Sequence, residues 1–388
     1  MFSTEFRSGA MTIRSRRLTV AEEAIADLRS RLRTTRWPAA TVDEGWTLGF
    51  DIDYLREIVA YWADEFDFAG FQERLNARPN YVVNVDGLEL HVEIHAPQRP
   101  SADSKTLLLL HGWPDGVQRF ERLTPLLDEH TLVIPSYPGY GFSQKPTSPL
   151  SCGDFGVLMA RLMDILGYRH YFVHGGDVGA PVADAVTRAA PDAVLGLHLT
   201  DLVYLLKVDP MPLPPAALEY LARGEEWEWS DGPYRHVQHS RPQMLAPGLS
   251  DSPAGLAAWI LEKFRAWSDC GGDLESRFDR DTLLTNLSIY WFTESIGSSF
   301  WVYWATDDGQ PSGRIDTPTW FSLFPEDLVR PTKVFADYFF NVAHWKEMPR
   351  GGHFAAMEEP ELLADELRSM LSSAAPLQPH ADIEHRQL

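Results

Sequence analysis

The sequence predicts an α/β fold built on a mostly parallel sheet, and three observations support this prediction. Short apolar runs of four to six residues recur between residues 106 and 199, which is typical of parallel strands that are buried on both faces. Helix-length segments separate these runs, and strands that alternate with helices favour a parallel sheet. The alternation stops after residue 199 for more than one hundred residues and then returns, so we expect one long helical insert in the α/β core.

The first 78 residues are expected to form a helical arm that packs on this core. Thr19 is a candidate N-cap, with Glu22 three residues later at the spacing of a capping box. Further along, apolar residues recur at the spacing of one helix face (Leu55, Ile58, Val59 and Trp62). The arm contains no glycine-rich catalytic turn, so we expect the chemistry to lie in the rest of the chain.

Strands are predicted from residue 81 onwards. Tyr81–Val85 and Leu88–Ile94 alternate apolar and polar residues on either side of the turn Asp86-Gly87, as half-buried strands of a hairpin do. The more apolar runs that follow are Thr106–Leu110, Thr131–Pro135, Tyr171–His174 and Val194–Leu199, and helices are expected at Phe155–Leu166 and Gly179–Ala189.

The stretch from Val203 to Arg314 is predicted to be helical and to form a lid over the C-terminal edge of the sheet. It is rich in Trp and Tyr and includes helices such as Pro253–Trp267. Strand and helix patterns return with Pro318–Phe324, His344–Met348 and a terminal helix at Pro360–Leu371. We therefore divide the chain into an N-terminal arm (1–78), a first core segment (79–202), a lid (203–315), a second core segment (316–376) and a polar tail (377–388).

The composition is that of an acidic globular protein. The chain of 388 residues carries 34 Lys and Arg against 55 Asp and Glu, a net charge of −21, and 44% of its residues are apolar. This apolar content excludes a disordered chain. The acidity argues against a nucleic-acid partner, because the protein would repel phosphates.

The sequence favours a cytoplasmic protein. Charged residues interrupt the first 28 residues, so these do not form a signal peptide, and no stretch reaches the roughly 18 apolar residues of a membrane span. The two cysteines, Cys152 and Cys270, cannot form a disulfide framework, which indicates a reducing compartment. Met11 is a second candidate start, and the oligomeric state stays open between a monomer and a homo-oligomer.

The segment Tyr171–Gly179 has the spacing of a nucleophile elbow. An apolar strand enters a turn with Gly175, Asp177 and Gly179 at alternate positions before a helix, the pattern G-x-nucleophile-x-G with Asp in the place of Ser. Glycines permit a strained turn, and the helix N-terminus favours an anion there. An ordinary turn with an Asp near the helix N-cap has the same pattern. No G-x-S-x-G pattern occurs in the chain, which argues against a serine esterase.

Two further segments point to the same chemistry. His111-Gly-Trp-Pro114 directly follows a predicted strand, where the backbone N–H of Trp113 can join that of Val178 in an oxyanion hole. The run Arg350-Gly-Gly-His353 follows a late strand, where a general base is expected. A tight loop with a buried Trp is the alternative explanation for the first segment, and a structural histidine is the alternative for the second.

An acid should complete this set after the strand Pro318–Phe324, because triads of this kind run nucleophile, acid and histidine along the chain. Glu326 and Asp327 both follow that strand. Spacing alone does not choose between them, and the other carboxylate is then an ordinary solvated loop residue.

With these motifs the sequence resembles the microsomal type of epoxide hydrolase, an α/β-hydrolase family, over nearly the whole chain. The motifs that match are Arg36-Trp37-Pro38 in the arm, His111-Gly-Trp-Pro114, Gly175-Gly-Asp177 and the very specific run Arg350-Gly-Gly-His-Phe-Ala-Ala-Met-Glu-Glu-Pro-Glu361. Two segments of the expected lid match as well, Tyr234-Arg-His-Val-Gln238 and Ser298-Ser-Phe-Trp-Val-Tyr303.

The resemblance implies an α/β-hydrolase core with an inserted lid and a wrapping arm. It makes Asp177 the nucleophile and His353 the general base. The family pattern Phe-Pro-x-acid selects Asp327 rather than Glu326 as the charge-relay carboxylate.

The resemblance also makes Tyr234 and Tyr303 the pair of phenols that polarise the epoxide oxygen; without it, both would be taken as core aromatics. One position departs from the family. A Trp usually follows the nucleophile, whereas this chain has Val178. The backbone N–H of the oxyanion hole is kept, and the pocket wall is expected to have extra room.

The implied reaction converts a small-molecule epoxide and water to a vicinal diol through an ester on the nucleophile, without a metal or an organic cofactor. The nearest alternative is a haloalkane dehalogenase, whose halide cradle uses a side-chain N–H donor that Val178 does not supply. A non-catalytic ligand-binding protein on the same scaffold is another. The aromatic lid and the small Val178 favour a bulky aryl epoxide, and bacterial relatives include enzymes of antibiotic biosynthesis.

Overall fold

A computed structural model describes residues 13–39, 45–202, 213–306 and 313–373, and the strands in these ranges form one sheet. Its order is β1-β2-β3-β5-β4-β6-β7-β8-β9. The pairings from β1 to β5 are antiparallel and all later pairings are parallel, which confirms a mostly parallel sheet. The strands are β1 Ile13–Ser15, β2 Asn80–Val85, β3 Leu88–His95, β4 Thr106–Leu110, β5 Thr131–Pro135, β6 Tyr171–Gly175, β7 Val194–Leu199, β8 Pro318–Leu323 and β9 Asn341–Glu347.

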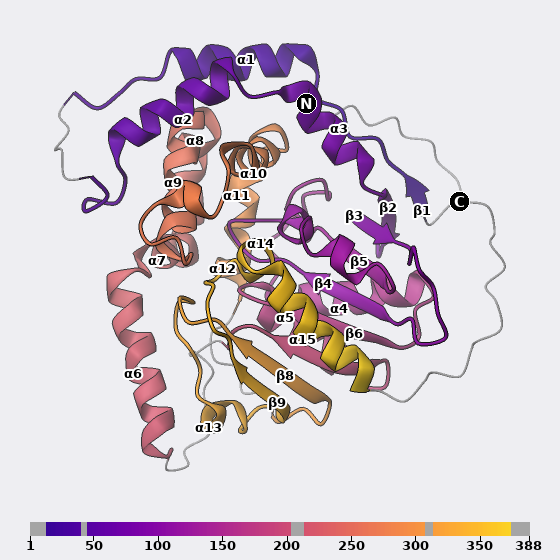
Figure 1. Cartoon of the computed structure of the whole chain (residues 1–388). Coiled ribbons are helices and arrows are strands. Elements are labelled where there is room, and N and C mark those ends of the chain that lie inside the picture. The colour runs from indigo at the N-terminus through magenta and orange to yellow at the C-terminus, as the bar shows by residue number, and fades with distance from the viewer. Residues whose placement is uncertain (1–12, 40–44, 203–212, 307–312, 374–388) are drawn as a thin grey trace.

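Apolar side chains lie on both faces of the central strands. In β4, Leu107 and Leu109 belong to one buried cluster, and Leu108 and Leu110 belong to the other, because successive side chains of a strand point to opposite faces. Helices α4 (Cys152–Ile165) and α5 (Gly179–Ala189) cover one face, and α15 (Pro360–Ser373) covers the other (Figure 1). This explains why these strands appear in the sequence as short apolar runs.

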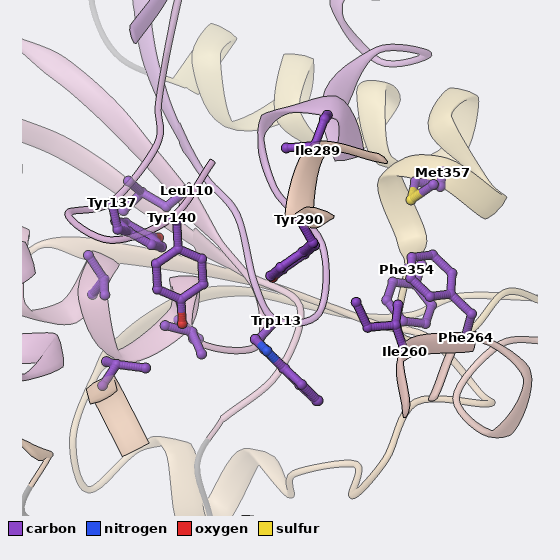
Figure 2. Packing of buried hydrophobic residues seen from close by; sticks show 14 of the residues in the cluster. Leu110, Trp113, Tyr137, Tyr140, Ile260, Phe264, Ile289, Tyr290, Phe354 and Met357 are labelled. Atoms are coloured by element: carbon purple, nitrogen blue, oxygen red, sulfur yellow. The ribbon is translucent and has the colours of Figure 1, made fainter. Parts of the chain in front are cut away.

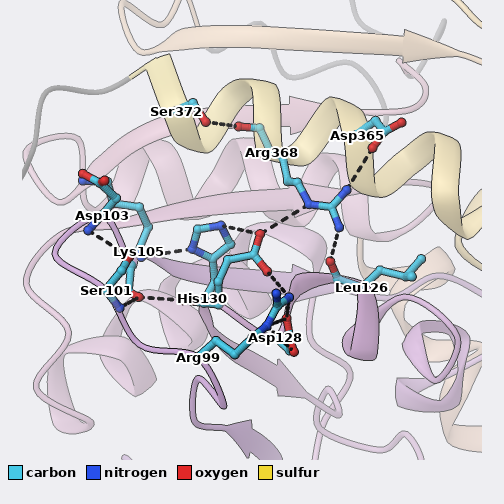
Figure 3. Close-up of polar contacts among 12 residues, drawn as sticks. Arg99, Ser101, Asp103, Lys105, Leu126, Asp128, His130, Asp365, Arg368 and Ser372 are labelled. Atoms are coloured by element: carbon cyan, nitrogen blue, oxygen red, sulfur yellow. Dashed lines mark hydrogen bonds and ion pairs between the residues drawn. The ribbon is translucent and has the colours of Figure 1, made fainter.

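Polar contacts fix the position of α15 over the sheet (Figure 3). Arg368 contacts Glu129 at 3.3 Å and Asp365 at 2.9 Å, and it donates to the backbone carbonyl of Leu126. Leu126 and Glu129 join α15 to the short helix η2 (Thr124–Leu127) and to the turn before β5, whereas Asp365 lies in α15 itself. Exposed ion pairs of this kind contribute only about 0–1 kcal/mol, so the buried apolar face of α15 supplies most of its stability.

A group of helices lies between β7 and β8 in the chain. Four of them begin with proline at the first helical position, where the missing N–H costs nothing and the fixed φ suits a helix. They are α6 Pro215–Ser230, α7 Pro233–Ser240, α8 Pro242–Asp251 and α9 Pro253–Ala266, followed by η3 Leu274–Ser276, α10 Arg280–Phe292, α11 Ile296–Ser299 and α12 Trp301–Ala305. The remaining short helices are η1 Val117–Phe120, α13 Lys333–Ala336 and α14 Ala355–Glu358.

The arm helices α1 (Glu22–Arg33), α2 (Ile52–Asp64) and α3 (Phe68–Ala77) lie against these inserted helices (Figure 1). The indole N–H of Trp62, which is fully buried, donates to Ser288 Oγ at 3.0 Å. The arm was expected to be helical, but it also contains the strand β1, which pairs with β2 at the edge of the sheet.

The predicted capping box at Thr19 is wrong. Helix α1 begins at Glu22, and its N-cap residue, Ala21, makes no side-chain capping bond. The backbone N–H groups of Leu18 and Val20 instead donate to Asn76 Oδ1 and Gln72 Oε1 of α3, at 2.8 and 2.7 Å. These side chains satisfy an extended backbone at the positions where a helical turn was expected.

Within the described ranges, none of the helices is long and apolar enough to cross a membrane. The second candidate start, Met11, and the predicted polar tail 377–388 lie outside the described residues.

Candidate active site

The turn between β6 and α5 holds Asp177 in a strained conformation. Asp177 has a φ of +56°, in the left-handed region that non-glycine residues rarely adopt. A Cβ on Gly175 would lie 2.1 Å from the carbonyl oxygen of Gly179, and a Cβ on Gly179 would lie 2.4 Å from that of Leu110. Only glycine fits at both positions, so the two glycines let the strand, the turn and the helix approach closely and place Asp177 at the N-terminus of α5.

The carboxylate of Asp177 meets different partners at its two oxygens. The backbone N–H of Trp113 donates to Oδ1 at 2.7 Å, and Nε2 of His353 lies 3.2 Å from Oδ2 as an ion pair. Burial alone would raise the pKa of Asp177, but the contact with His353 and the N–H groups of Val178 and Trp113 outweigh it and lower the pKa. Asp177 is therefore an anion at neutral pH, held by the two expected backbone donors.

His353 follows β9 and contacts Asp327, which follows the neighbouring parallel strand β8, so the two residues meet at the same edge of the sheet. Nδ1 of His353 donates to Asp327 Oδ1 at 2.7 Å, and Asp327 also accepts the N–H of Leu328 at 2.8 Å. Glu326 is exposed and contributes only backbone contacts here. The structure thus gives the contact with the histidine to Asp327 and not to Glu326.

The charges around His353 keep it protonated. Burial lowers the pKa of this imidazole, but the charge of Asp327 and the contacts with Asp177 and Asp327 raise it to about 10. In the free protein at neutral pH, His353 is an imidazolium between two carboxylates.

Two polar residues that the sequence analysis did not select hold the loop of His353. Arg119 donates to the carbonyl oxygen of His353 at 2.6 Å and pairs with Asp115 at 2.6 Å. Glu358 accepts hydrogen bonds from three backbone N–H groups, those of Asp269, Gly352 and Phe354. Two features of the sequence could have indicated these residues. Glu358 stands in the specific run that follows His353, and Asp115 and Arg119 are four residues apart.

Asp201 is a third carboxyl group at this site, and it was also missed. It stands two residues after the end of β7, and its Oδ2 accepts the backbone N–H of Asp177 at 3.1 Å. Burial and the charge of Asp327 raise the pKa of Asp201 to about 8. An acid directly after a parallel strand, at the edge of the sheet that carries Asp177, is the signal that could have found it.

The two predicted phenols come from inserted helices, Tyr234 from α7 and Tyr303 from α12. Their ring centroids are 6.3 Å apart, and Trp113 stacks on Tyr234 at 5.3 Å and meets Tyr303 at 6.0 Å. Trp113 is fully buried and, in the view of Figure 2, projects between Tyr140 and the aromatic group near Phe354. Trp113 thus contacts Asp177 through its backbone N–H and both tyrosines through its ring.

The hydroxyl of Tyr303 is buried and has no hydrogen-bond partner among the described residues. Burial, with the neighbouring Tyr234, raises the pKa of Tyr303 well above its usual value. The phenol is therefore protonated and has a donor to offer to a molecule in the site.

Comparison with known proteins agrees with this geometry. Residues 13–120 match the family described as the epoxide hydrolase N terminus, and residues 105–360 match the alpha/beta hydrolase fold. A putative epoxide hydrolase of Stigmatella aurantiaca is 38% identical, over 91% of this chain and 83% of that protein. Epoxide hydrolase 1 of Sus scrofa is 32% identical, over 93% of this chain and 88% of that protein.

Solved structures agree as well. The juvenile hormone epoxide hydrolase of the silkworm Bombyx mori superposes with a TM-score of 0.83 at 29% identity, over 94% of each chain. The Aspergillus niger epoxide hydrolase superposes with a TM-score of 0.80 at 27% identity, over 94% of this chain and 97% of that chain. The chain therefore belongs to the epoxide hydrolase family, whose members are hydrolases of the α/β-hydrolase fold that act on epoxide ethers.

Proposed function

We propose that this protein converts an epoxide and water to a vicinal diol through a covalent ester on Asp177. The observation that carries this proposal is that the two carboxylate oxygens of Asp177 have different partners. The oxyanion donor Trp113 lies on Oδ1, and the base His353 lies on Oδ2. A carboxylate held in this way can attack with Oδ2 while Oδ1 becomes the ester carbonyl.

In the first step, Oδ2 of Asp177 attacks a carbon of the epoxide ring, and the bond from that carbon to the epoxide oxygen breaks. The oxygen develops negative charge as it leaves. Tyr303 and Tyr234 are placed to donate hydrogen bonds to it, which lowers the barrier where the charge appears. The alkoxide takes one proton from a phenol, which regains it from the imidazolium of His353, so the products of this step are a hydroxyalkyl ester of Asp177 and a neutral imidazole.

In the second step, His353 removes a proton from water, and the resulting hydroxide adds to the ester carbonyl carbon. The oxyanion forms on Oδ1, where the N–H groups of Trp113 and Val178 stabilise it. Asp327 stabilises the imidazolium that forms. Collapse of this intermediate breaks the bond to the alkyl oxygen, which takes the proton of the added hydroxyl, so that the diol leaves and Asp177 is again a carboxylate beside protonated His353.

The direct test is one turnover in oxygen-18 water. Water oxygen should enter the carboxylate of Asp177, and the diol of this first turnover should stay unlabelled. Asp177→Ala should abolish turnover with the fold retained, whereas Asp103→Ala, at an exposed aspartate, should behave as the parent. A labelled first-turnover diol with unlabelled Asp177 would exclude the covalent route.

The site suits an oxygen leaving group better than a halide. A halide cradle needs free side-chain N–H donors, but Val178 has none, and the indole N–H of Trp113 donates to Ser299 Oγ at 3.2 Å. A chloroalkane that released halide at a rate similar to epoxide turnover would contradict this assignment.

For the substrate we propose a bulky aryl epoxide. Aromatic rings pack around Tyr234, with Trp113 at 5.3 Å, Trp267 at 5.1 Å and Trp227 at 6.3 Å between centroids. Such faces favour offset or edge contacts with a further ring. A panel of aryl and alkyl epoxides with chiral analysis of the diols tests this, and equal kcat/KM for short alkyl and aryl epoxides would contradict it.

A further inference from the structure

Asp201 packs directly on the elbow that carries the nucleophile. Its neighbour Thr200 donates its backbone N–H to the carbonyl oxygen of Gly175 at 3.3 Å. A Cβ on Gly176 would lie 2.2 Å from Thr200 Oγ1, so no side chain separates the two segments. The end of β7 and the elbow therefore form one tightly packed unit.

Within this unit, the two oxygens of Asp201 have different surroundings. Oδ2 accepts the backbone N–H of Asp177 at 3.1 Å. Oδ1 is buried and has no hydrogen-bond partner among the described residues. A carboxylic acid with its proton on Oδ1 also leaves that O–H donor unpaired, but an unpaired neutral hydroxyl is much less costly to bury than an ionised carboxylate with one oxygen unpaired.

The charges that act on Asp201 favour the neutral form as well. Asp177 acts on it from the elbow after β6, Asp327 from the loop after β8 and His353 from the loop after β9. Three carboxyl groups thus share one imidazolium. The guanidinium of Arg119 pairs with Asp115 at 2.6 Å, and its charge also acts on Asp177 and Asp327.

We propose that Asp201 is a positioning residue that holds the backbone of the nucleophile as a neutral carboxylic acid. Its carbonyl-type oxygen, Oδ2, accepts the N–H of Asp177 and fixes the strained turn, while the proton resides on Oδ1. A neutral acceptor holds the turn without placing a third negative charge beside Asp177 and Asp327. The pKa of about 8 agrees with this assignment.

The proposal makes asparagine the correct mimic of Asp201, because the side-chain amide keeps the acceptor oxygen and cannot ionise. This part of the inference rests on the proposed function of Asp177. At pH 7, Asp201→Leu should lower kcat about tenfold or more, since the elbow loses its acceptor, and Asp201→Asn should recover most of that loss. Asp192→Asn, at an exposed aspartate before β7, is the matched control and should behave as the parent.

A second measurement needs no substrate. When an aspartate is neutral in the folded protein and ionised in the unfolded chain, the free energy of unfolding of the protein falls as the pH rises from about 4 to 8. Asp201→Asn does not share this loss. The ratio of the folding equilibrium constants of Asp201→Asn and parent, from urea unfolding, should therefore rise by up to about tenfold per pH unit between pH 5 and 7.

A ratio that stays constant or falls between pH 5 and 7 would show that Asp201 is already an anion there and would overturn the proposal. So would a kcat for Asp201→Asn as low as that of Asp201→Leu while the ester on Asp177 still forms. Failure of the proposed function looks different: one turnover of the parent in oxygen-18 water would leave Asp177 unlabelled, whatever the unfolding ratio.

Discussion

Gly112→Ala should disable the nucleophile through a single methyl group. Gly112 precedes the oxyanion donor Trp113, and a Cβ at Gly112 would lie 2.7 Å from Asp177 Cβ and 2.8 Å from its Oδ1. These distances are about 0.7 Å short of ordinary contact. Either the carboxylate or the loop of Trp113 must move by that amount, and each movement separates Oδ1 from its donor.

The expected magnitude follows from this displacement. A misplacement approaching 1 Å at the reacting atoms costs about 10²-fold in rate, and loss of one oxyanion donor costs about 10²- to 10³-fold. Overpacking at a buried site destabilises the fold by about 1–3 kcal/mol. We therefore expect kcat to fall about 10²-fold, with a modest decrease in Tm.

Steady-state diol formation and thermal unfolding measure the two effects. Gly248→Ala is the matched control, because nothing lies within 4 Å of a Cβ at this exposed position of α8. It should keep the parent kcat. A Gly112→Ala protein with kcat within threefold of the parent and an unchanged Tm would refute the close contact between this loop and Asp177.

Three further results are expected. Asp327→Asn should slow ester hydrolysis by about 10²-fold or more, so intact-protein mass spectrometry of quenched reactions should show an ester that the parent does not accumulate. Tyr303→Phe should slow ester formation by about 10²-fold and leave hydrolysis of preformed ester unaffected, as single-turnover kinetics can measure; an equal loss in both steps would contradict the role of this phenol. The folded-state pKa of His353, about 10, lies above its ordinary value of 6.5, so its stabilisation is complete below pH 6.5 and is lost as the pH rises through 10. The loss is at most about 5 kcal/mol, and urea unfolding at pH 6.5, 8 and 9.5 should show a decline that Asp327→Asn reduces.

The sequence predicted the sheet well because its central strands are buried on both faces. The apolar runs Thr106–Leu110 and Thr131–Pro135 are strands with the predicted bounds, since few polar residues tolerate that environment. The edges were harder to predict. The strand Ile13–Ser15 has only three residues and is half-exposed, so it carries no alternation that a sequence pattern could detect. Helix α1 begins later than expected because distant side chains on α3 satisfy the backbone before it.

In the candidate site as well, residues that act within a local motif could be predicted from the sequence, and residues whose partners lie far away in the chain could not. Asp177 could be selected from its own turn, because glycines stand at fixed spacing on either side of it, although the close contact that requires Gly179 comes from Leu110 in a different strand. The choice between Glu326 and Asp327 depends on the direction in which each side chain points from the loop after β8, which spacing does not contain. Arg119 and Asp201 act on backbone atoms more than twenty residues away in the chain, so neither forms a local pattern with its partner.

In the proposed mechanism, the two steps need opposite protonation states of His353, and the charges in the site supply the change. While Asp177 is a carboxylate, it and Asp327 keep His353 protonated. Attack on the epoxide turns Asp177 into a neutral ester, which removes one of these two charges and lowers the pKa of His353. The imidazolium can then give up the proton that the alkoxide requires. The neutral imidazole that results is a base, and it exists only when the ester is present. A neutral Asp201 supports this order, because an ionised Asp201 would replace the lost charge and keep the imidazole protonated.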